Sequence, residues 1–161
     1  MRFILVLVML FNICLIEHAN SETINRVVAY VGNIAITLDD FKEELSKLRE
    51  KMPDIKSEEV INILINKTIL LKKARELFME GRDEDIINSY IDLKIKSSII
   101  IPENQVRQFY DENREKMNDR PYAAVRSEIE KYLFERELNK RLKEHIEEIK
   151  KDEDIKVIFM P

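Results

Sequence analysis

Cysteine and glycine are almost missing from this chain, and each shortage excludes a class of chemistry. Cys14 is the one cysteine among 161 residues, and it lies in an apolar N-terminal segment that we expect to be removed. The remaining chain then has no internal disulfide and depends on packing for its stability. The two glycines, Gly32 and Gly81, are too few for a glycine-rich loop that cradles phosphate.

Histidine and basic charge are also scarce. His18 belongs to the N-terminal segment, and His145 has no second histidine or cysteine at metal-ligand spacing. We therefore expect His145 to be a solvated helix residue, and we expect no metal or cofactor. The net charge is −4, which lacks the basic excess that nucleic-acid binding requires. The acidic pairs fall near expected helix starts, where helix-dipole compensation explains them without acid–base catalysis.

The first nineteen residues have the pattern of a secretory signal. Arg2 precedes an apolar run over Phe3–Ile16, and Ala19 is a small residue suited to a cleavage point. The run is shorter than the roughly 17–25 residues of a membrane span, although an uncleaved anchor is the alternative. Cleavage predicts a periplasmic location and a single domain over 20–161, about 142 residues with their own core.

The stretch after the signal predicts a hairpin followed by a helix. Val27–Val31 and Ile34–Thr37 are short β-prone runs joined by Gly32-Asn33. Glycine at the first central position accepts the positive φ of a type II′ turn. A lone hairpin is marginal in water, so this one needs a further partner.

Apolar spacing of 3 and 4 residues predicts five helices. The β-prone segment Ser97–Ile101 separates the third from the fourth, and Asn118–Pro121 is a polar seam before the fifth. The second helix is apolar around most of its circumference, so we expect it to be central and buried. The first helix is expected over Leu38–Lys51, and the second from Ser57 to a stop at Gly81. The third is expected to begin at Asp83 and the fourth at Pro102, and the fifth to run over Tyr122–Lys151.

Ile155–Met160 alternates like a strand and is the expected partner of the hairpin. Closing a loop of about 120 residues costs on the order of 4 kcal/mol plus a constant. Burying four Val or Ile side chains returns roughly 6–12 kcal/mol as an upper value. The sequence therefore predicts a mainly α fold, five helices closed by a small antiparallel sheet that joins both ends.

Methionine and aromatic residues exceed what one clean helical stripe needs. Core packing is the simpler explanation for any one of them. The functional alternative is a surface for extended apolar peptide, since flexible Met and amphipathic Tyr adapt to many sequences. The candidate peptide-binding residues are Tyr90, Phe109, Tyr110, Met117, Tyr122 and Tyr132.

The order of these segments resembles the SurA-type periplasmic chaperones. VVAYVGNIAITLDDF is similar to the strand, turn, strand and helix that open their N-terminal domain, and INKTILLKKARELFMEG is similar to their second helix. PENQVRQFYDENREKM resembles the helix before their peptidyl-prolyl isomerase module. The remaining segment, PYAAVRSEIEKYLFERELNKRLKEHIEEIKKDEDIKVIF, resembles the long helix and strand after it.

One departure from that family is as informative as the likeness. Relatives with isomerase activity insert a parvulin-type domain between the last two helices, whereas here Met117 and Pro121 are almost adjacent. Two glycines cannot supply the parvulin signatures, so no catalytic residue carries over. The resemblance implies a chaperone module without its isomerase, and hence a protein that is not an enzyme.

Three functions follow in order of preference. The first is an ATP-independent holdase for unfolded exported or outer-membrane polypeptides. The second is an interaction protein that binds one folded partner or forms a homodimer through its long last helix. The third is a peptidyl-prolyl isomerase, which faster cis/trans conversion of a proline tetrapeptide would reveal.

Overall fold

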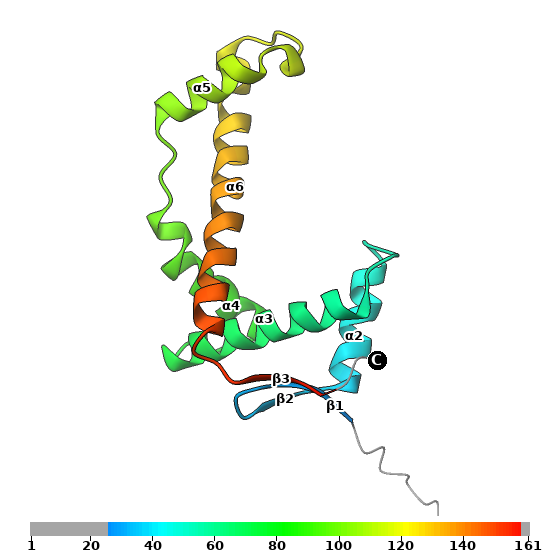
Figure 1. The fold of residues 1–161 in the computed structure, drawn as a ribbon. Coiled ribbons are helices and arrows are strands. Elements are labelled where there is room, and N and C mark those ends of the chain that lie inside the picture. Colours follow the sequence, from blue (N-terminus) through cyan, green and yellow to red (C-terminus); the bar gives the residue numbers. More distant parts are fainter. Residues whose placement is uncertain (1–25, 159–161) are drawn as a thin grey trace, which may run out of the picture.

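The computed structural model describes residues 26–158 and has the predicted mainly α architecture with a small sheet (Figure 1). The expected signal over 1–19 and the end of the last predicted strand lie outside these residues. The elements are β1 (Val27–Val31), β2 (Ile34–Thr37), α2 (Leu38–Arg49), α3 (Ser57–Glu76), α4 (Asp83–Lys94), η2 (Lys96–Ser98), α5 (Glu103–Asn113), η3 (Glu115–Met117), α6 (Tyr122–Lys150) and β3 (Ile155–Val157).

The three strands form one antiparallel sheet in the order β2-β1-β3. The hairpin turn has φ of +59° at Gly32, whereas Asn33 keeps a negative φ, which is the pattern expected of a type II′ turn. A bulge between Val27 and Ala29 interrupts the pairing of β1 with β2. A bulge adds one residue to one strand and increases its local twist.

Strand β3 is the partner that the hairpin was predicted to need. Val31 pairs with Ile155, and Ala29 pairs with Val157. Two further backbone bonds extend the seam, from the Gly32 amide to the Asp154 carbonyl (2.8 Å) and from the Ile158 amide to the Val28 carbonyl (2.9 Å). The predicted closure of the chain is therefore confirmed over residues 154–158.

Helix α3 is the centre of the molecule, as predicted. It crosses the inner face of the sheet, and α2 covers the sheet beside it (Figure 1). This main core contains the fully buried β1 residues and one side of α3. Its buried members are Val28, Ala29, Val31, Ile36, Phe41, Ile55, Val60, Ile61, Leu64, Ile65, Ile69 and Ile149.

Helix α2 begins with the capping box that the sequence indicated. The Asp40 amide donates to Thr37 Oγ1 (3.3 Å), and the Thr37 amide donates to Asp40 Oδ2 (2.8 Å). These two bonds satisfy backbone donors that have no partner within the helix. They also fix the angle at which the chain leaves β2.

Helix α3 ends earlier than predicted, because Phe78 and not Gly81 provides the stop. The Phe78 amide donates to the Arg75 carbonyl (2.9 Å) and the Met79 amide to the Ala74 carbonyl (3.2 Å). This is the Schellman pattern, whose left-handed residue is usually glycine. Phe78 adopts φ of +58° there, and its side chain is 92% exposed.

The prediction that His145 is a solvated residue was wrong. His145 is half-buried where α6 lies beside α4, and its Nε2 is 2.8 Å from the hydroxyl of Tyr90. Burial in turn raises the pKa of Tyr90. Both residues belong to the seam between α4 and α6, which a pattern read along one helix at a time does not reveal.

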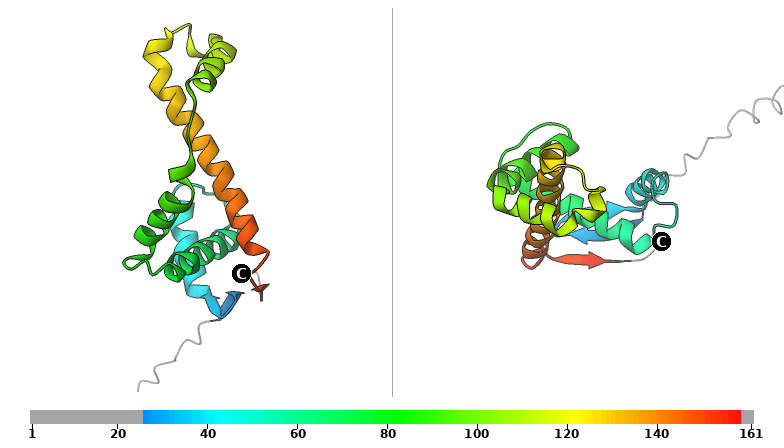
Figure 2. Two further views of the ribbon diagram at one scale, coloured as in Figure 1. Left: turned by 90° about the vertical axis from the view of Figure 1, so that its left-hand side faces the viewer. Right: turned by 90° about the horizontal axis from the view of Figure 1, so that it is seen from above.

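The N-terminal half of α6 projects away from the body and carries α5 (Figure 2). The 29 residues of α6 rise about 1.5 Å each, so its two ends lie roughly 43 Å apart. The C-terminal end packs on α3 and α4 through Ile146 and Ile149. The N-terminal end packs on α5 in a separate buried cluster of Val106, Val125, Ile129 and Leu133. We call α5, η3 and the N-terminal half of α6 the arm.

Glu153 ties the start of β3 to α3, and we expect its loss to destabilise the body. Its carboxylate is 5% exposed, accepts a bond from Lys72 Nζ (2.6 Å) and lies 3.5 Å from Lys73 Nζ. The Lys72 hydrogen bond and both lysine charges lower the pKa of Glu153. Glu153→Gln should reduce the free energy of unfolding at pH 7 by about 1–3 kcal/mol.

The pH dependence of that loss checks its cause. A lowered pKa contributes stability that is complete above the unfolded-state value of about 4.3 and disappears as pH falls through the folded value. Urea unfolding should therefore show the gap between wild type and Glu153→Gln closing in acid. Asp154→Asn, at a pair with Lys156 that is about two-thirds exposed, is the control with the smaller effect. A gap independent of pH would contradict this account.

Phe78→Gly should stabilise the protein. A positive φ costs an L-residue about 1–2 kcal/mol, and the flexibility of glycine in the unfolded chain offsets part of that gain. We expect a net increase of about 0.5–1 kcal/mol, or about 2 °C in Tm, by thermal unfolding. Phe78→Ala keeps the unfavourable φ and should give no such increase. Equal stability of the two variants would refute the explanation.

Candidate functional site

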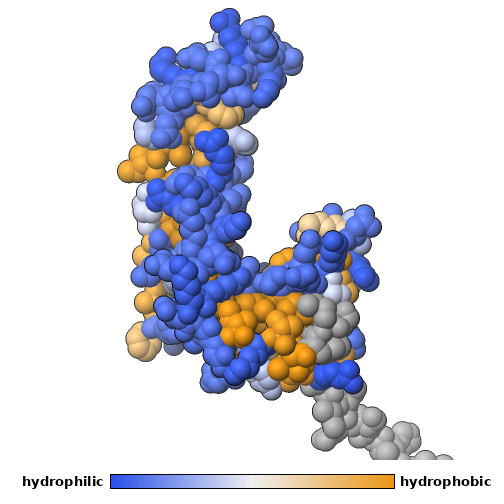
Figure 3. Space-filling view, in the orientation of Figure 1, coloured by the Kyte–Doolittle hydropathy of each residue, from blue (hydrophilic) through white to orange (hydrophobic). Residues whose placement is uncertain are grey.

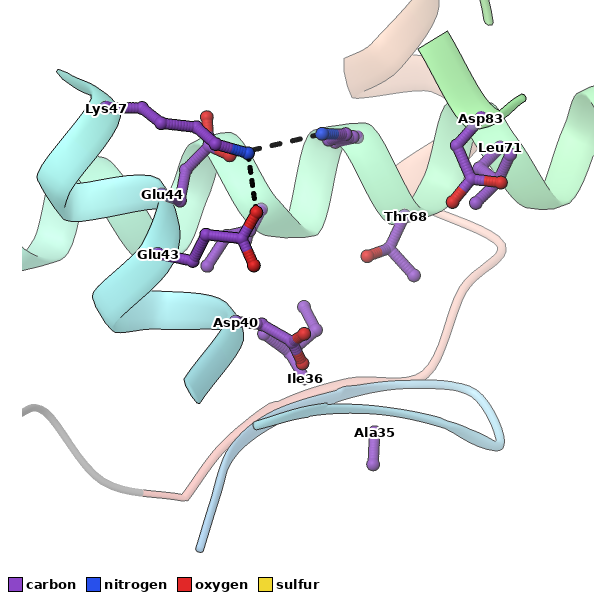
Figure 4. Close-up of a pocket in the computed structure, with 11 residues that line it drawn as sticks. Ala35, Ile36, Asp40, Glu43, Glu44, Lys47, Thr68, Leu71 and Asp83 are labelled. Carbon is purple, nitrogen blue, oxygen red and sulfur yellow. Dashed lines mark hydrogen bonds and ion pairs between the residues drawn. The ribbon is translucent and has the colours of Figure 1, made fainter. Parts of the chain in front are cut away.

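A pocket of about 320 Å³ lies between α2, α3 and β2, and its charged side chains face one another (Figure 4). Lys47 Nζ lies 2.6 Å from Glu43, and Lys67 Nζ lies 4.0 Å from Glu44. Asp40 is engaged in capping α2, and Asp83 pairs with Arg75 (2.8 Å). These charged groups already have partners, which explains them as a helix cap and as ion pairs within α2 or between neighbouring elements.

The arm contains a different kind of cavity, an open groove of about 380 Å³. It lies where the end of α5 and η3 meet α6, and we call it the arm groove. Val125 and Ile129 form its buried floor. In Figure 3 the tip of the arm is largely hydrophilic, and apolar surface appears just below it, alongside α6. The groove is lined by Phe109, Lys116, Met117, Asn118, Arg120, Val125, Glu128, Ile129 and Tyr132.

Three of the six predicted peptide-binding residues line the arm groove together. The rings of Phe109 and Tyr132 lie 5.2 Å apart at 41°, so they form one continuous aromatic wall. Met117 enters from η3 and is half-buried. Tyr132 is 51% exposed, although its ring contacts Phe109, which packs against the buried cluster of the arm. An apolar ligand would cover these three side chains at once.

Two other predicted residues brace the arm instead of lining its groove. The rings of Tyr110 and Tyr122 meet edge to face with centroids 5.3 Å apart. The Tyr110 hydroxyl donates to the Arg120 carbonyl (2.9 Å), which holds the turn before α6. The Tyr122 hydroxyl donates to Glu103 Oε1 (2.6 Å), which joins the first turns of α5 and α6.

Tyr90 does not belong to this site. It is 3% exposed and lies in α4 in a buried cluster with Leu70, Ala74, Ile86 and Ile146. Its apolar neighbours on α4 indicated a helical stripe, and the structure places Tyr90 within the core that this stripe forms. The prediction of Tyr90 as a peptide-binding residue is corrected accordingly.

The chain reverses between η3 and α6 at two left-handed residues, Asn118 (φ +54°) and Asp119 (φ +52°). Asn and Asp tolerate this conformation better than other residues with a side chain. Arg114 pairs with Asp119 (3.0 Å) across the reversal. The predicted polar seam at 118–121 is thus a tight turn that sets the end wall of the arm groove.

A polar rim surrounds the apolar wall, and sequence reasoning missed it. Arg120 pairs with Glu128 (3.1 Å), and this hydrogen bond lowers the pKa of Glu128. Lys116 and Asn118 complete the rim. Arg120 and Glu128 are eight positions apart, and Lys116 and Asn118 lie in η3 and the turn that follows it. Helical periodicity therefore does not identify these residues. An apolar centre with a polar rim is the usual composition of a recognition surface.

Within residues 26–158, no three His, Cys, Asp or Glu side chains are grouped to hold a metal ion. None of the helices in this range is long and apolar enough to cross a membrane.

Comparisons with protein-family models, with curated protein sequences and with solved structures find no match to this chain.

The bracing bond in the arm predicts a measurable titration. The Tyr122 hydroxyl and then Arg126 lower the pKa of Glu103. Tyr122→Phe should therefore move this pKa upward toward its ordinary value, as measured by NMR of the carboxyl carbon. Tyr132→Phe changes a hydroxyl in the same arm that does not contact Glu103, and it should leave the titration unchanged. An identical Glu103 titration in Tyr122→Phe would show that the bond is not formed in solution.

Proposed function

We propose that this protein is an ATP-independent holdase that binds extended apolar polypeptide in the arm groove. The observation that carries the proposal is the shared wall of Phe109, Met117 and Tyr132 beside an apolar floor, held at the end of a long helix. The arm is braced by its own ion pairs and tyrosine hydroxyls, so the groove is formed before any ligand arrives. A preformed groove binds without the cost of ordering its own side chains.

The residue types suit a binder of many sequences. Methionine is flexible and polarisable, and a partly exposed tyrosine offers both a ring and a hydroxyl. The polar groups of the open groove lie at its rim and not on the aromatic wall, which favours apolar content over a specific sequence. Each contact is weak, so affinity in the micromolar range is expected.

The resemblance to SurA-type chaperones adds the biological setting of the proposal. The clients would be exported polypeptides, including outer-membrane proteins, and the location would be the periplasm. The tight turn at 118–121 is the point at which catalytic relatives carry their isomerase. On this proposal the protein shields its clients and does not isomerise their prolines.

Aggregation of an unfolded outer-membrane protein, diluted from urea with and without this protein, tests the proposal. Light scattering should fall at several-fold molar excess. The double variant Met117→Ser with Tyr132→Ser should weaken protection about ten-fold, which corresponds to about 1.4 kcal/mol of lost binding.

Phe78→Ser provides the matched control for that experiment. It also replaces an exposed aromatic residue, but one that lies at the end of α3 and outside the arm groove. It should protect the client as well as wild type does. Equal loss in both variants would indicate general hydrophobic adhesion, and no protection by the wild-type protein would end the proposal.

A further inference from the structure

The linker Ile99–Ile101, which joins η2 to α5, is an extended segment that no other strand accompanies in the described chain. Ile99 has φ of −87° and ψ of +118°, and Pro102 at the other end has φ of −67° and ψ of +145°. Both residues therefore have extended backbones. The sequence had indicated a β-prone run here, and the structure places it alongside α6, between the body and α5 (Figures 1 and 2).

The backbone of this linker has hydrogen-bonding groups to offer. Among residues 26–158, neither Ile100 nor Ile101 has a backbone partner, and the Ile99 amide donates back to the Lys96 carbonyl (3.0 Å). Ile100 is 82% exposed, so water and not protein surrounds it. A row of unpaired amides and carbonyls on an extended segment is a template for another strand.

A second groove, of about 550 Å³, lies beside these backbone groups. We call it the linker groove. One wall is the linker and the other is a single face of α6, since its α6 residues are spaced three and four apart. That face lies on the opposite side of α6 from Glu128, Ile129 and Tyr132 of the arm groove. The α6 residues of the linker groove are Ser127, Glu130, Lys131 and Phe134.

We propose that Ile99–Ile101 binds extended apolar polypeptide by strand addition. Backbone bonds to the linker would align the bound strand, and its alternate side chains would enter the linker groove against Phe134. The proposal deepens the proposed function, on which it rests for its ligand class, by adding a second site and a binding mode. Recognition through the backbone is independent of sequence, which suits a protein that shields many clients.

The length of the linker favours a client strand over a second copy of this chain. Three residues supply only a few backbone bonds, and two copies paired there bury far less than the roughly 1,200–2,000 Å² of a stable interface. A contact of that size is weak and easily reversed. Rapid release is a disadvantage for a dimer and an advantage for a holdase.

The decisive probe is a short peptide of alternating valine and serine, compared with a twin that is methylated on alternate backbone nitrogens. Methylation removes hydrogen-bond donors and leaves the side chains in place. Amide exchange at Ile100 or Ile101 should slow about ten-fold with saturating unmethylated peptide. The methylated twin should bind about ten-fold more weakly, which is the loss of one or two net hydrogen bonds.

Variants locate the peptide at the linker groove. Phe134→Ser should weaken binding of the peptide to the linker, whereas Phe78→Ser, which replaces an exposed aromatic residue outside both grooves, should leave this binding unchanged. Circular dichroism of both variants checks that the helices are intact. Equal binding of the two peptides, or unchanged exchange at both isoleucines, would overturn strand addition.

The outcomes also separate this proposal from the proposed function. Protection of the unfolded outer-membrane protein together with equal binding of the two peptides would reject strand addition alone. No binding of either peptide and no protection of the client would reject both proposals. Slow amide exchange at Ile100 that depends on protein concentration, without peptide, would show self-pairing and overturn the client site.

Discussion

The pairing of β1 with β3 is the constraint on which the arrangement of the body depends. It joins segments on either side of all the helices, and β1, with Val28, Ala29 and Val31 fully buried, lies between two strands and packs on α3. The ion pairs of Glu153 reinforce the seam just before β3 begins. With β1 and β3 held in one sheet, α6 must return to the body at its C-terminal end. Its other end is left free to carry the arm.

That arrangement separates two tasks within one helix. The lower part of α6 contributes Ile146 and Ile149 to the body, while its upper part contributes Val125 and Ile129 to the arm. The arm has its own buried cluster, so a groove at its tip is supported locally. Side chains in that groove stay exposed because the body contacts of α6 at Ile146 lie about 26 Å along the helix from Ile129 in the groove floor.

The elements with a strong local signal were predictable from the sequence, and those that depend on contacts between helices were not. The hairpin, the Thr37–Asp40 capping box, the boundaries of α6 and the closing strand all follow from spacing or turn chemistry. Tyr90 and His145 were misassigned because their burial depends on a contact between two helices. Tyr90 on α4 bonds to His145 on α6, and the sequence of either helix alone does not show this contact. Phe78 was missed because a phenylalanine occupies a position where turn chemistry expects glycine. Of the arm groove, the aromatic wall was predictable and the polar rim was not.

The distance along the chain between β1 and β3 also affects the order in which the parts fold. The hairpin must close a loop of about 120 residues to reach the strand that completes its sheet, which costs conformational entropy. Helices α5 and α6 are neighbours in sequence and pack locally, and contacts of that kind form fast. The arm, with both grooves, is therefore expected to be assembled while the body still waits for its final strand. The arm then matures ahead of the body, whose sheet is completed last.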